Sequence, residues 1–279
     1  MMLRCIPVPA GALCRWIAVA LAALCLFGSP GCQTEEITGR RQFIAFGEQT
    51  EIDMGVEAYR QTLEKAPICK DKATNDLVRR VGMRIAEASK KSDYKWEFTV
   101  IQDDKTVNAF ALPGGKVAVY TGILPVTKDE AGLATVIGHE VAHATAHHGA
   151  ERMTRSSAIQ LVLQGGETAL GLALQNKDPG TVDAVMQAFG IGAQVGLELP
   201  FDRKQESAAD HIGIVYMARA GYDPAQAIEF WKRMSTMTQG GGTPQFLSTH
   251  PSHETRVENL KTWLPEALKE LENSPQRKK

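Results

Sequence analysis

The stretch Gly138-His139-Glu140-Val141-Ala142-His143 contains the pattern H-E-x-x-H, the strongest chemical signal in the chain. Residues four apart in a helix share a face, so His139 and His143 can both reach one Zn²⁺ at roughly 2.0–2.1 Å. Glu140 then faces a water molecule on the metal. Zinc lowers the pKa of that water to about 7, and a carboxylate that takes the proton completes what hydrolysis of a peptide bond requires.

The residues around this pattern predict a helix. Asp129 and Glu130 follow Lys128, and carboxylates favour a helix N-terminus because they offset its partial positive charge. Apolar residues recur at helical spacing and form one stripe, at Leu133, Val136, Ile137, Val141 and Ala144. The two histidines therefore lie in the middle of a helix. The alternative interpretation is a helix that merely carries two surface histidines.

The first residues of the chain predict export. Arg4 and Arg15 precede the uncharged apolar run WIAVALAALCLFG (16–28), which is too short to span a bilayer and fits the h-region of a signal peptide. Ser29-Pro30-Gly31-Cys32 follows, with small residues before a cysteine as in bacterial lipoprotein signals. We expect residues 1–31 to be a signal peptide and Cys32 to carry lipid. Simple signal-peptide cleavage is the alternative.

This address sets the expected domain organisation. Three of the five cysteines lie before Cys32, so only Cys69 would remain unmodified, and no intramolecular disulfide is expected. A lipid on Cys32 would tether the protein to a membrane without spanning it. Gln33 after this cysteine resembles lipoproteins sent to the outer membrane in didermic bacteria, so we expect an outer-membrane lipoprotein on the periplasmic side of the envelope. The expected parts are a lipid-anchored tether at 32–49, one domain at 50–272 and a polar tail at 273–279.

Composition is that of an ordinary globular protein. Of 279 residues, 43% are hydrophobic and 23% charged, and the net charge is −1. A chain so close to neutral offers no electrostatic reason to expect nucleic acid as a partner.

Three short stretches before the metal-binding helix predict a small antiparallel sheet. Residues 95–101 alternate between apolar and polar side chains, and 107–112 and 116–121 flank the turn Pro113-Gly114-Gly115. An exposed edge of such a sheet could hold an extended peptide by strand addition. A sheet that serves only as scaffold is the alternative.

The remaining chain predicts mostly helices. Helical spacing or turn signals mark helices at 48–65, 75–89, 224–236 and 252–271, the last with a break before Pro265. Two apolar pieces at 158–174 and 182–199 fit helices packed around the site. They could also form a movable cover over it or a membrane-facing surface.

A catalytic zinc site needs a third protein ligand. Glu206 and Asp210 are four apart and share a helix face. One carboxylate can bind the metal while the other accepts a hydrogen bond from a ligand imidazole and fixes its tautomer. Taken alone, this pair also fits a solvated helix face.

Together these motifs resemble the M48 family of zinc metallopeptidases, which includes HtpX-type, periplasmic lipoprotein-type, mitochondrial quality-control and CAAX-processing members. The resemblance is carried by Thr38-Gly39-Arg40, Asn108-Ala109-Phe110, Pro113-Gly114-Gly115, His139 to His143, His148, Glu206 to Gly213, and Thr249-His250-Pro251 to Arg256. It implies a mostly helical α+β fold of the zincin-like (gluzincin) class, with the small antiparallel sheet beside the metal-binding helix.

The resemblance also implies roles for particular residues. His139, His143 and Glu206 would be the zinc ligands, and Glu140 the general base and later proton shuttle. Asp210 would be the buried carboxylate near the ligands. Asn108 and Ala109 fall on the strand that similar enzymes use to align substrate. The family usually has a second acidic residue two positions after its ligand, where this chain has Ala208.

His250 lies in a loop-like stretch and has three possible interpretations. It could donate a hydrogen bond to the oxyanion that forms during attack by water. It could instead be a fourth zinc ligand that holds the enzyme latent, because a filled tetrahedron leaves no place for water. It could also be a surface histidine without a role. Arg256, six residues later, could pair with a carboxylate near the site.

The sequence therefore predicts a stand-alone zinc endopeptidase with one Zn²⁺ per chain. The resemblance implies extended or misfolded envelope proteins as substrates, as in membrane-protein quality control, and we expect the membrane to be a partner through the lipid anchor. The rival hypothesis is a chaperone-like envelope lipoprotein that keeps zinc for stability and cleaves little.

Overall fold

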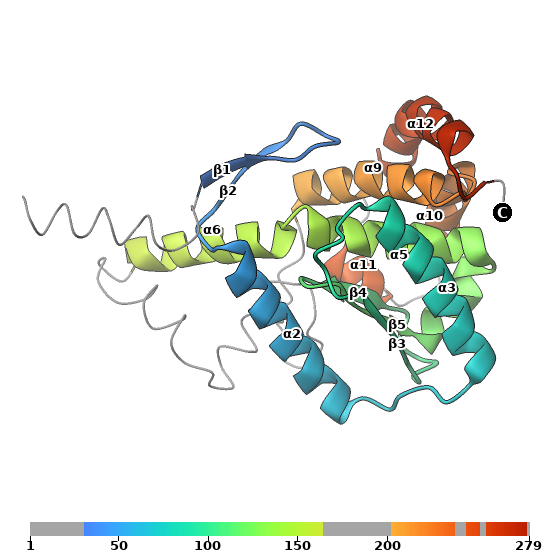
Figure 1. The fold of residues 1–279 in the computed structure, drawn as a ribbon, viewed down its shortest axis with the longest axis horizontal. Helices are drawn as coiled ribbons and strands as arrows, with labels where there is room; N and C mark the ends of the chain where they lie inside the picture. Colours follow the sequence, from blue (N-terminus) through green and yellow to red (C-terminus); the bar gives the residue numbers. More distant parts are fainter. Residues whose placement is uncertain (1–30, 164–201, 238–243, 252–254, 278–279) are drawn as a thin grey trace, which may run out of the picture.

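The computed structural model describes residues 31–163, 202–237, 244–251 and 255–277. The expected signal peptide up to residue 30, the apolar pieces beyond residue 163, and the expected start of the last helix at 252–254 lie outside the described residues. Figure 1 shows the described chain as a mostly helical α+β structure, with one small sheet beside a central pair of helices. This agrees with the predicted fold class.

The central pair consists of α5 (Glu130–Thr145) and α9 (Arg203–Arg219). Each helix begins at an aspartate that caps it. The Asp129 carboxylate accepts a hydrogen bond from the Gly132 N–H, and the Asp202 carboxylate accepts from the two N–H groups of Lys204 and Gln205. These caps fix where the two helices start, and thereby which residues they direct at each other.

Two glycines let α5 and α9 cross at close range. A Cβ atom on Gly138 would lie 2.9 Å from the carbonyl oxygen of Gly213, and one on Gly213 would lie 3.0 Å from the backbone nitrogen of His139. Neither position can take a larger side chain unless the helices separate. The crossing occurs directly beside His139, so it sets how near α9 comes to the metal-binding motif.

The sheet lies against α5 and consists of β3 (Glu97–Ile101), β4 (Ala109–Leu112) and β5 (Lys116–Tyr120). Its strand order is β3-β5-β4, with β4 at an edge. β4 and β5 pair antiparallel across the expected turn, whereas β3 and β5 pair parallel. The expectation of a wholly antiparallel sheet was therefore wrong. The hairpin reverses the chain and inserts β5 between β3 and β4, so β5 runs in the direction of β3.

The other helices surround this centre (Figure 1). They are α2 (Glu48–Lys65), α3 (Lys72–Ala88), α4 (Leu124–Thr127), α6 (His148–Leu163), α10 (Ala225–Met237), α11 (Gln245–Thr249) and α12 (Arg256–Asn273), with a short 3₁₀ helix at Thr121–Ile123 before α4. Apolar side chains of α3, α5, α9, α10 and the sheet form the main core. None of the helices in the described part of the chain has the length and apolar character needed to cross a bilayer.

Helix α12 corrects one expectation. It continues through Pro265 without a break. A proline inside a helix removes the hydrogen bond to the carbonyl four residues earlier. Here that carbonyl belongs to Lys261, which is exposed, so water can hydrogen-bond to it. Leu260 and Ala267 are buried on the other face, and their packing holds the helix together around the proline.

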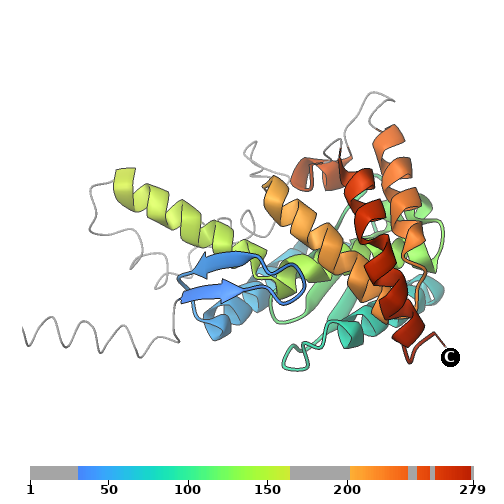
Figure 2. The ribbon, with the colours of Figure 1, turned by 90° about the horizontal axis from the view of Figure 1, so that it is seen from above.

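A β-hairpin precedes α2 and occupies part of the segment expected to be a tether. β1 (Gly31–Thr34) pairs antiparallel with β2 (Arg41–Ile44), and the hairpin lies beside α6 (Figure 2). Gln42, Ile44 and Phe46 are buried, whereas Cys32 is exposed. The second strand of this segment thus belongs to the folded body.

Candidate active site

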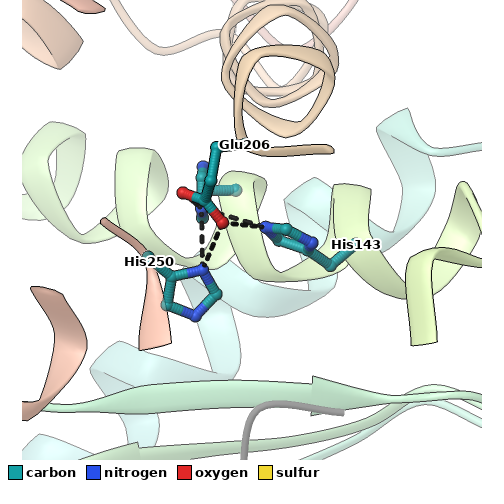
Figure 3. A group of neighbouring side chains, drawn as sticks. His143, Glu206 and His250 are labelled. Carbon is teal, nitrogen blue, oxygen red and sulfur yellow. Dashed lines mark hydrogen bonds and ion pairs between the residues drawn. The ribbon is translucent and has the colours of Figure 1, made fainter. Parts of the chain in front are cut away.

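Four side chains from three parts of the chain converge between α5, α9 and α11. They are His139 and His143 of α5, Glu206 of α9, and His250, which follows α11. Figure 3 shows His143 and His250 directed at the Glu206 carboxylate. One potential ligand atom from each lies within 4.8 Å of all the others. All four residues are buried, and Glu206 is fully so. The expected ligands are thus together, and His250 lies in the non-helical bend directly after α11.

The distances among these atoms fit a single tetrahedral ion. The Nε2 atoms of His139 and His143 are 3.1 Å apart, and His250 Nδ1 is 3.3 Å from His139 Nε2. Glu206 Oε1 lies 3.3 Å from His143 Nε2 and 3.0 Å from His250 Nδ1, and Glu206 Oε2 lies 3.5 Å from His139 Nε2. Zinc bonds of 2.0–2.1 Å give a tetrahedron with edges of roughly 3.3 Å. The three nitrogens and one carboxylate also form a donor set that zinc prefers.

Asp210 and Arg256 hold two of these side chains in place. Asp210 Oδ1 lies 3.0 Å from His139 Nδ1, and this ion-pair contact favours a proton on Nδ1, which directs Nε2 to a metal. Arg256 donates to Asp210 Oδ2 at 2.7 Å and to Glu206 Oε2 at 2.5 Å. The Arg256 side chain is 1% exposed, so a single buried guanidinium orients both carboxylates.

The pKa shifts in the cluster favour a neutral His143, an anionic Glu206 and a protonated His139. Burial lowers the pKa of His143 well below its usual range, which leaves this imidazole neutral. Burial also lowers the pKa of His139, but hydrogen bonds with Asp210 and Glu206 outweigh it and raise that pKa to about 9. Burial raises the pKa of Glu206, yet the His250 charge and three histidine hydrogen bonds hold it well below its usual range. A cation would therefore meet an anionic Glu206 and displace one proton from His139.

Glu140 lies beside this group of four but is not one of the residues whose ligand atoms converge. The Glu140 Oε1 atom lies 3.3 Å from His250 Nε2, and the backbone N–H of Ala111 in β4 hydrogen-bonds to the Glu140 carboxylate. Burial raises the pKa of Glu140 above its usual value, against the opposing charges of His250 and His139. A carboxylate with a raised pKa is better suited to take a proton near neutral pH.

An aromatic group behind the site was not predicted from the sequence. The Arg256 guanidinium lies 3.8 Å from the centre of the Trp231 ring. Trp231 stacks on Phe246 at 5.8 Å and meets the edge of His139 at 5.5 Å. Phe246 in turn lies 4.8 Å from His250. These contacts join residues from α5, α10, α11 and α12, and such long-range packing leaves no local sequence signal.

The other described histidines lie outside the group of four. His148 is fully buried, and its Nδ1 lies 2.9 Å from Nδ1 of His143, so it supports that imidazole from behind. His147 pairs with Glu51 at 2.6 Å. His211 pairs with Glu266 at 2.7 Å.

Asn108 and Ala109 lie at the start of the edge strand β4, which packs against α5. Both are buried. The Asn108 side-chain oxygen accepts a hydrogen bond from the Ala109 N–H at 2.9 Å, while the Asn108 carbonyl accepts from the Tyr120 N–H of β5. Asn108 is thus paired with β5 through its carbonyl, and the Ala109 N–H is bonded to the Asn108 side chain at the edge of the sheet that packs against the metal-binding helix.

Comparison with known proteins agrees with this site. The model of peptidase family M48 matches residues 72–264. Mitochondrial metalloendopeptidase OMA1 of Schizosaccharomyces pombe is 38% identical over 242 residues, covering 85% of this chain and 68% of the relative. The human OMA1 metalloendopeptidase is 30% identical over 256 residues, covering 87% of this chain and 48% of the relative.

A bacterial relative is also similar. The beta-barrel assembly-enhancing protease of Escherichia coli is 28% identical over 209 residues, which cover 74% of this chain and 42% of the relative. The family match spans α3 to α12 and includes every residue of the buried cluster. This chain therefore belongs to peptidase family M48 and is a zinc metalloendopeptidase.

Proposed function

We propose that His139, His143 and Glu206 hold the zinc and that Glu140 is the general base. The observation that carries this proposal is the set of contacts of 3.0–3.5 Å among the donor atoms of His139, His143, Glu206 and His250. A zinc ion held by these residues would supply Lewis-acid chemistry for the substrate carbonyl and would lower the pKa of water. Glu140 takes a proton from the attacking water and passes it to the leaving amine.

Asp210 and Arg256 prepare the site in this proposal. Asp210 fixes the tautomer of His139, and Arg256 keeps the Glu206 carboxylate directed at the three imidazoles. Neither side chain contacts the reacting atoms, so both are positioning residues.

We further propose that the described arrangement is a latent form closed by His250. Its Nδ1 lies at tetrahedral-edge distance from His139 and Glu206, where it would complete the zinc coordination and leave no place for water. Its Nε2 lies 3.3 Å from Glu140, so His250 also engages the base. Movement of His250 away from the zinc would free both; donation of a hydrogen bond to the oxyanion is the alternative role of this imidazole.

Substrate recognition at β4 is the next part of the proposal. β4 is an edge strand beside α5, so an extended peptide could pair with it close to Glu140. Asn108 and Ala109 would align the peptide. Such binding reads backbone more than side chains, which suits misfolded or misassembled proteins of many sequences.

The cellular setting that we propose is the periplasmic side of a bacterial envelope, with Cys32 lipidated and the protein attached to the outer membrane. The exposure of Cys32 and the similarity to a bacterial beta-barrel assembly-enhancing protease support this setting. The proposed role there is membrane-protein quality control. The full chain expressed in a didermic bacterium should float with outer-membrane vesicles, and Cys32→Ser should move it to the soluble fraction. Membrane attachment that survives the substitution would contradict the anchor.

Zinc content and casein cleavage test the catalytic proposal. The unaltered protein and Glu140→Gln should both bind about one zinc, whereas only the unaltered protein should cleave. Glu64→Gln, a substitution of an exposed glutamate on α2, is the matched control and should change neither quantity. Equal cleavage by Glu140→Gln would reject the base assignment. Cellular function that survives Glu140→Gln would instead favour the chaperone-like alternative.

Removal of His250 tests the latent form. His250→Ala should retain zinc on the other three ligands and cleave casein faster than the unaltered protein, because a coordination position becomes available for water. Zinc-edge absorption should show three imidazoles on the unaltered protein and two on the variant. A resting enzyme with two imidazoles, combined with slower cleavage by His250→Ala, would leave oxyanion stabilisation as the role of His250.

A further inference from the structure

The turn between β1 and β2 places one arginine so that it can act on the distant zinc site. Gly39 has φ +67°, a left-handed conformation that glycine adopts without strain. The Thr38 hydroxyl accepts a hydrogen bond from the Arg40 N–H at 3.2 Å. This local geometry turns the Arg40 side chain inward, where it is only 17% exposed.

Arg40 binds a buried carboxylate at the start of α6. Its Nη1 donates to both oxygens of Glu151, at 3.0 and 2.8 Å, and its Nη2 donates to the Gln42 side-chain oxygen at 2.5 Å. The Glu151 side chain is 11% exposed, so this pair is largely shielded from water. In such surroundings a charge-assisted contact orients its partners firmly.

Glu151 passes this constraint to the helix that carries Glu206. The Gln205 side-chain nitrogen donates to Glu151 Oε2 at 2.7 Å and to the His148 carbonyl at 3.1 Å. Gln205 is fully buried and directly precedes Glu206. One amide therefore ties the start of α9 to the first turn of α6.

The start of α6 and the hairpin also support His143, the second histidine of the H-E-x-x-H pattern. His148 opens α6, and its ring lies 2.9 Å from the ring of His143. The Gln42 side chain, already bound by Arg40, donates to the carbonyl of Ala146 at the end of α5 at 2.9 Å. Through Arg40 and Gln42, the hairpin thus contacts the end of α5 and the start of α6. Through Glu151 it is also linked to Gln205 at the start of α9.

We propose that Arg40 is a positioning residue for the zinc site. Its guanidinium holds Glu151 and Gln42, which set the positions of Glu206 and His143 through Gln205, His148 and Ala146. This inference rests on the proposed roles of His143 and Glu206 as ligands. Lysine cannot replace Arg40 fully, because a single ammonium lacks the planar set of donors that reaches Glu151 and Gln42 together.

The test measures the metal site of the full chain directly. Arg40→Met should bind zinc more weakly in chelator competition, by less than the roughly 10–100-fold that is typical for loss of a residue in direct contact with a metal ligand, because Arg40 acts through Glu151 and Gln42. The visible absorption of the Co²⁺-substituted protein should change, because the ligands shift. In peptide cleavage kcat should fall while KM stays within about twofold, because the side-chain hydrogen bonds of Arg40 go to Glu151 and Gln42 and not to β4, where substrate is proposed to bind. Arg40→Lys should change each quantity in the same direction by less.

A matched control separates positioning from simple stability. Arg219 binds Glu270 through two contacts of 3.0 Å at the other end of α9, and no described contact links it to the ligands. Arg219→Met should lower the unfolding midpoint but leave zinc affinity and the Co²⁺ spectrum unchanged. Circular dichroism checks folding, and Arg40→Lys carries the test if Arg40→Met does not fold.

Two results have distinct meanings. A folded Arg40 variant would overturn the inference if its zinc affinity were within about twofold of that of the unaltered protein and its Co²⁺ spectrum were unchanged. Unchanged zinc affinity in Glu206→Ala would instead overturn the ligand assignment, and it would do so whatever Arg40 shows.

Discussion

Ionic side chains occur in two contrasting settings, the buried group around Arg256 and the exposed group around Arg60 on α2. Arg256, Glu206 and Asp210 have side chains no more than 1% exposed. Arg60 pairs with Glu57 and Glu64, and these three side chains are between 37% and 56% exposed. Both groups consist of one arginine and two carboxylates, so the difference between them is burial.

Burial distinguishes an ionic group that has a role in the site from an ionic group that is only part of the surface. Water screens the exposed pairs, and such pairs usually contribute little to stability. Removing three charges from water is costly, and an apolar replacement would often be as stable. The retention of buried charges at Arg256 therefore points to their task, which is to orient His139 and Glu206. The variants below can confirm or break this distinction.

The largest effect should come from Arg256→Met. Without the guanidinium, Glu206 and Asp210 remain buried with less compensation, and breaking a buried pair typically costs about 3–5 kcal/mol. We expect a loss of this size in the free energy of unfolding, measured by urea denaturation of the zinc-loaded protein. Arg60→Met is the matched control and should leave the denaturation midpoint unchanged. Comparable shifts in the two variants would remove the distinction between the settings.

A smaller effect should follow from Asp210→Asn. The amide is nearly the same size but carries no charge to favour the proton on His139 Nδ1, so His139 presents Nε2 to the metal less well. We expect zinc affinity to fall about 10–100-fold in chelator competition. Asp53→Asn on the exposed face of α2 provides the control. An unchanged zinc affinity would show that Asp210 serves only the Arg256 pair.

Much of the fold follows from local sequence signals. The helix over 48–65 has the predicted bounds. Helix α5 begins where Asp129 and Glu130 predicted a helix N-terminus. Alternation located the strands but could not give the direction in which β3 pairs, because pairing depends on where the hairpin inserts. The break predicted before Pro265 does not occur. The free-energy cost of a proline inside a helix depends on packing across α12 and on the access of water to the Lys261 carbonyl, which the sequence does not show.

The same division applies to the site. Spacing brought His139 and His143 together, and it put Glu206 and Asp210 on one face, because helical geometry fixes both pairs. Family resemblance indicated His250. The contacts of Arg256 with two carboxylates and with Trp231 join helices that lie apart in the chain. The sequence indicated that Arg256 could pair with a carboxylate near the site, and the structure confirms that pairing. That Arg256 holds two carboxylates and also contacts Trp231 could not be predicted, because these contacts arise only when α9, α10 and α12 pack.

The pair of His147 and Glu51 lies between the two settings and should have the smallest effect. Their side chains are 13% and 2% exposed, and the pair joins α2 to the turn after α5. Burial lowers the pKa of His147, but the hydrogen bond and charge of Glu51 outweigh it and raise the pKa above its usual 6.5. A raised histidine pKa stabilises the fold fully below pH 6.5, and this contribution is lost as pH rises through the folded-state value. The gap in unfolding midpoint between the unaltered protein and His147→Gln should therefore be wider at pH 6 than at pH 9. Other titrating groups cancel in this difference, so a gap that stays constant with pH would mean that the pair holds α2 by shape alone and that His147 gains nothing from its charge.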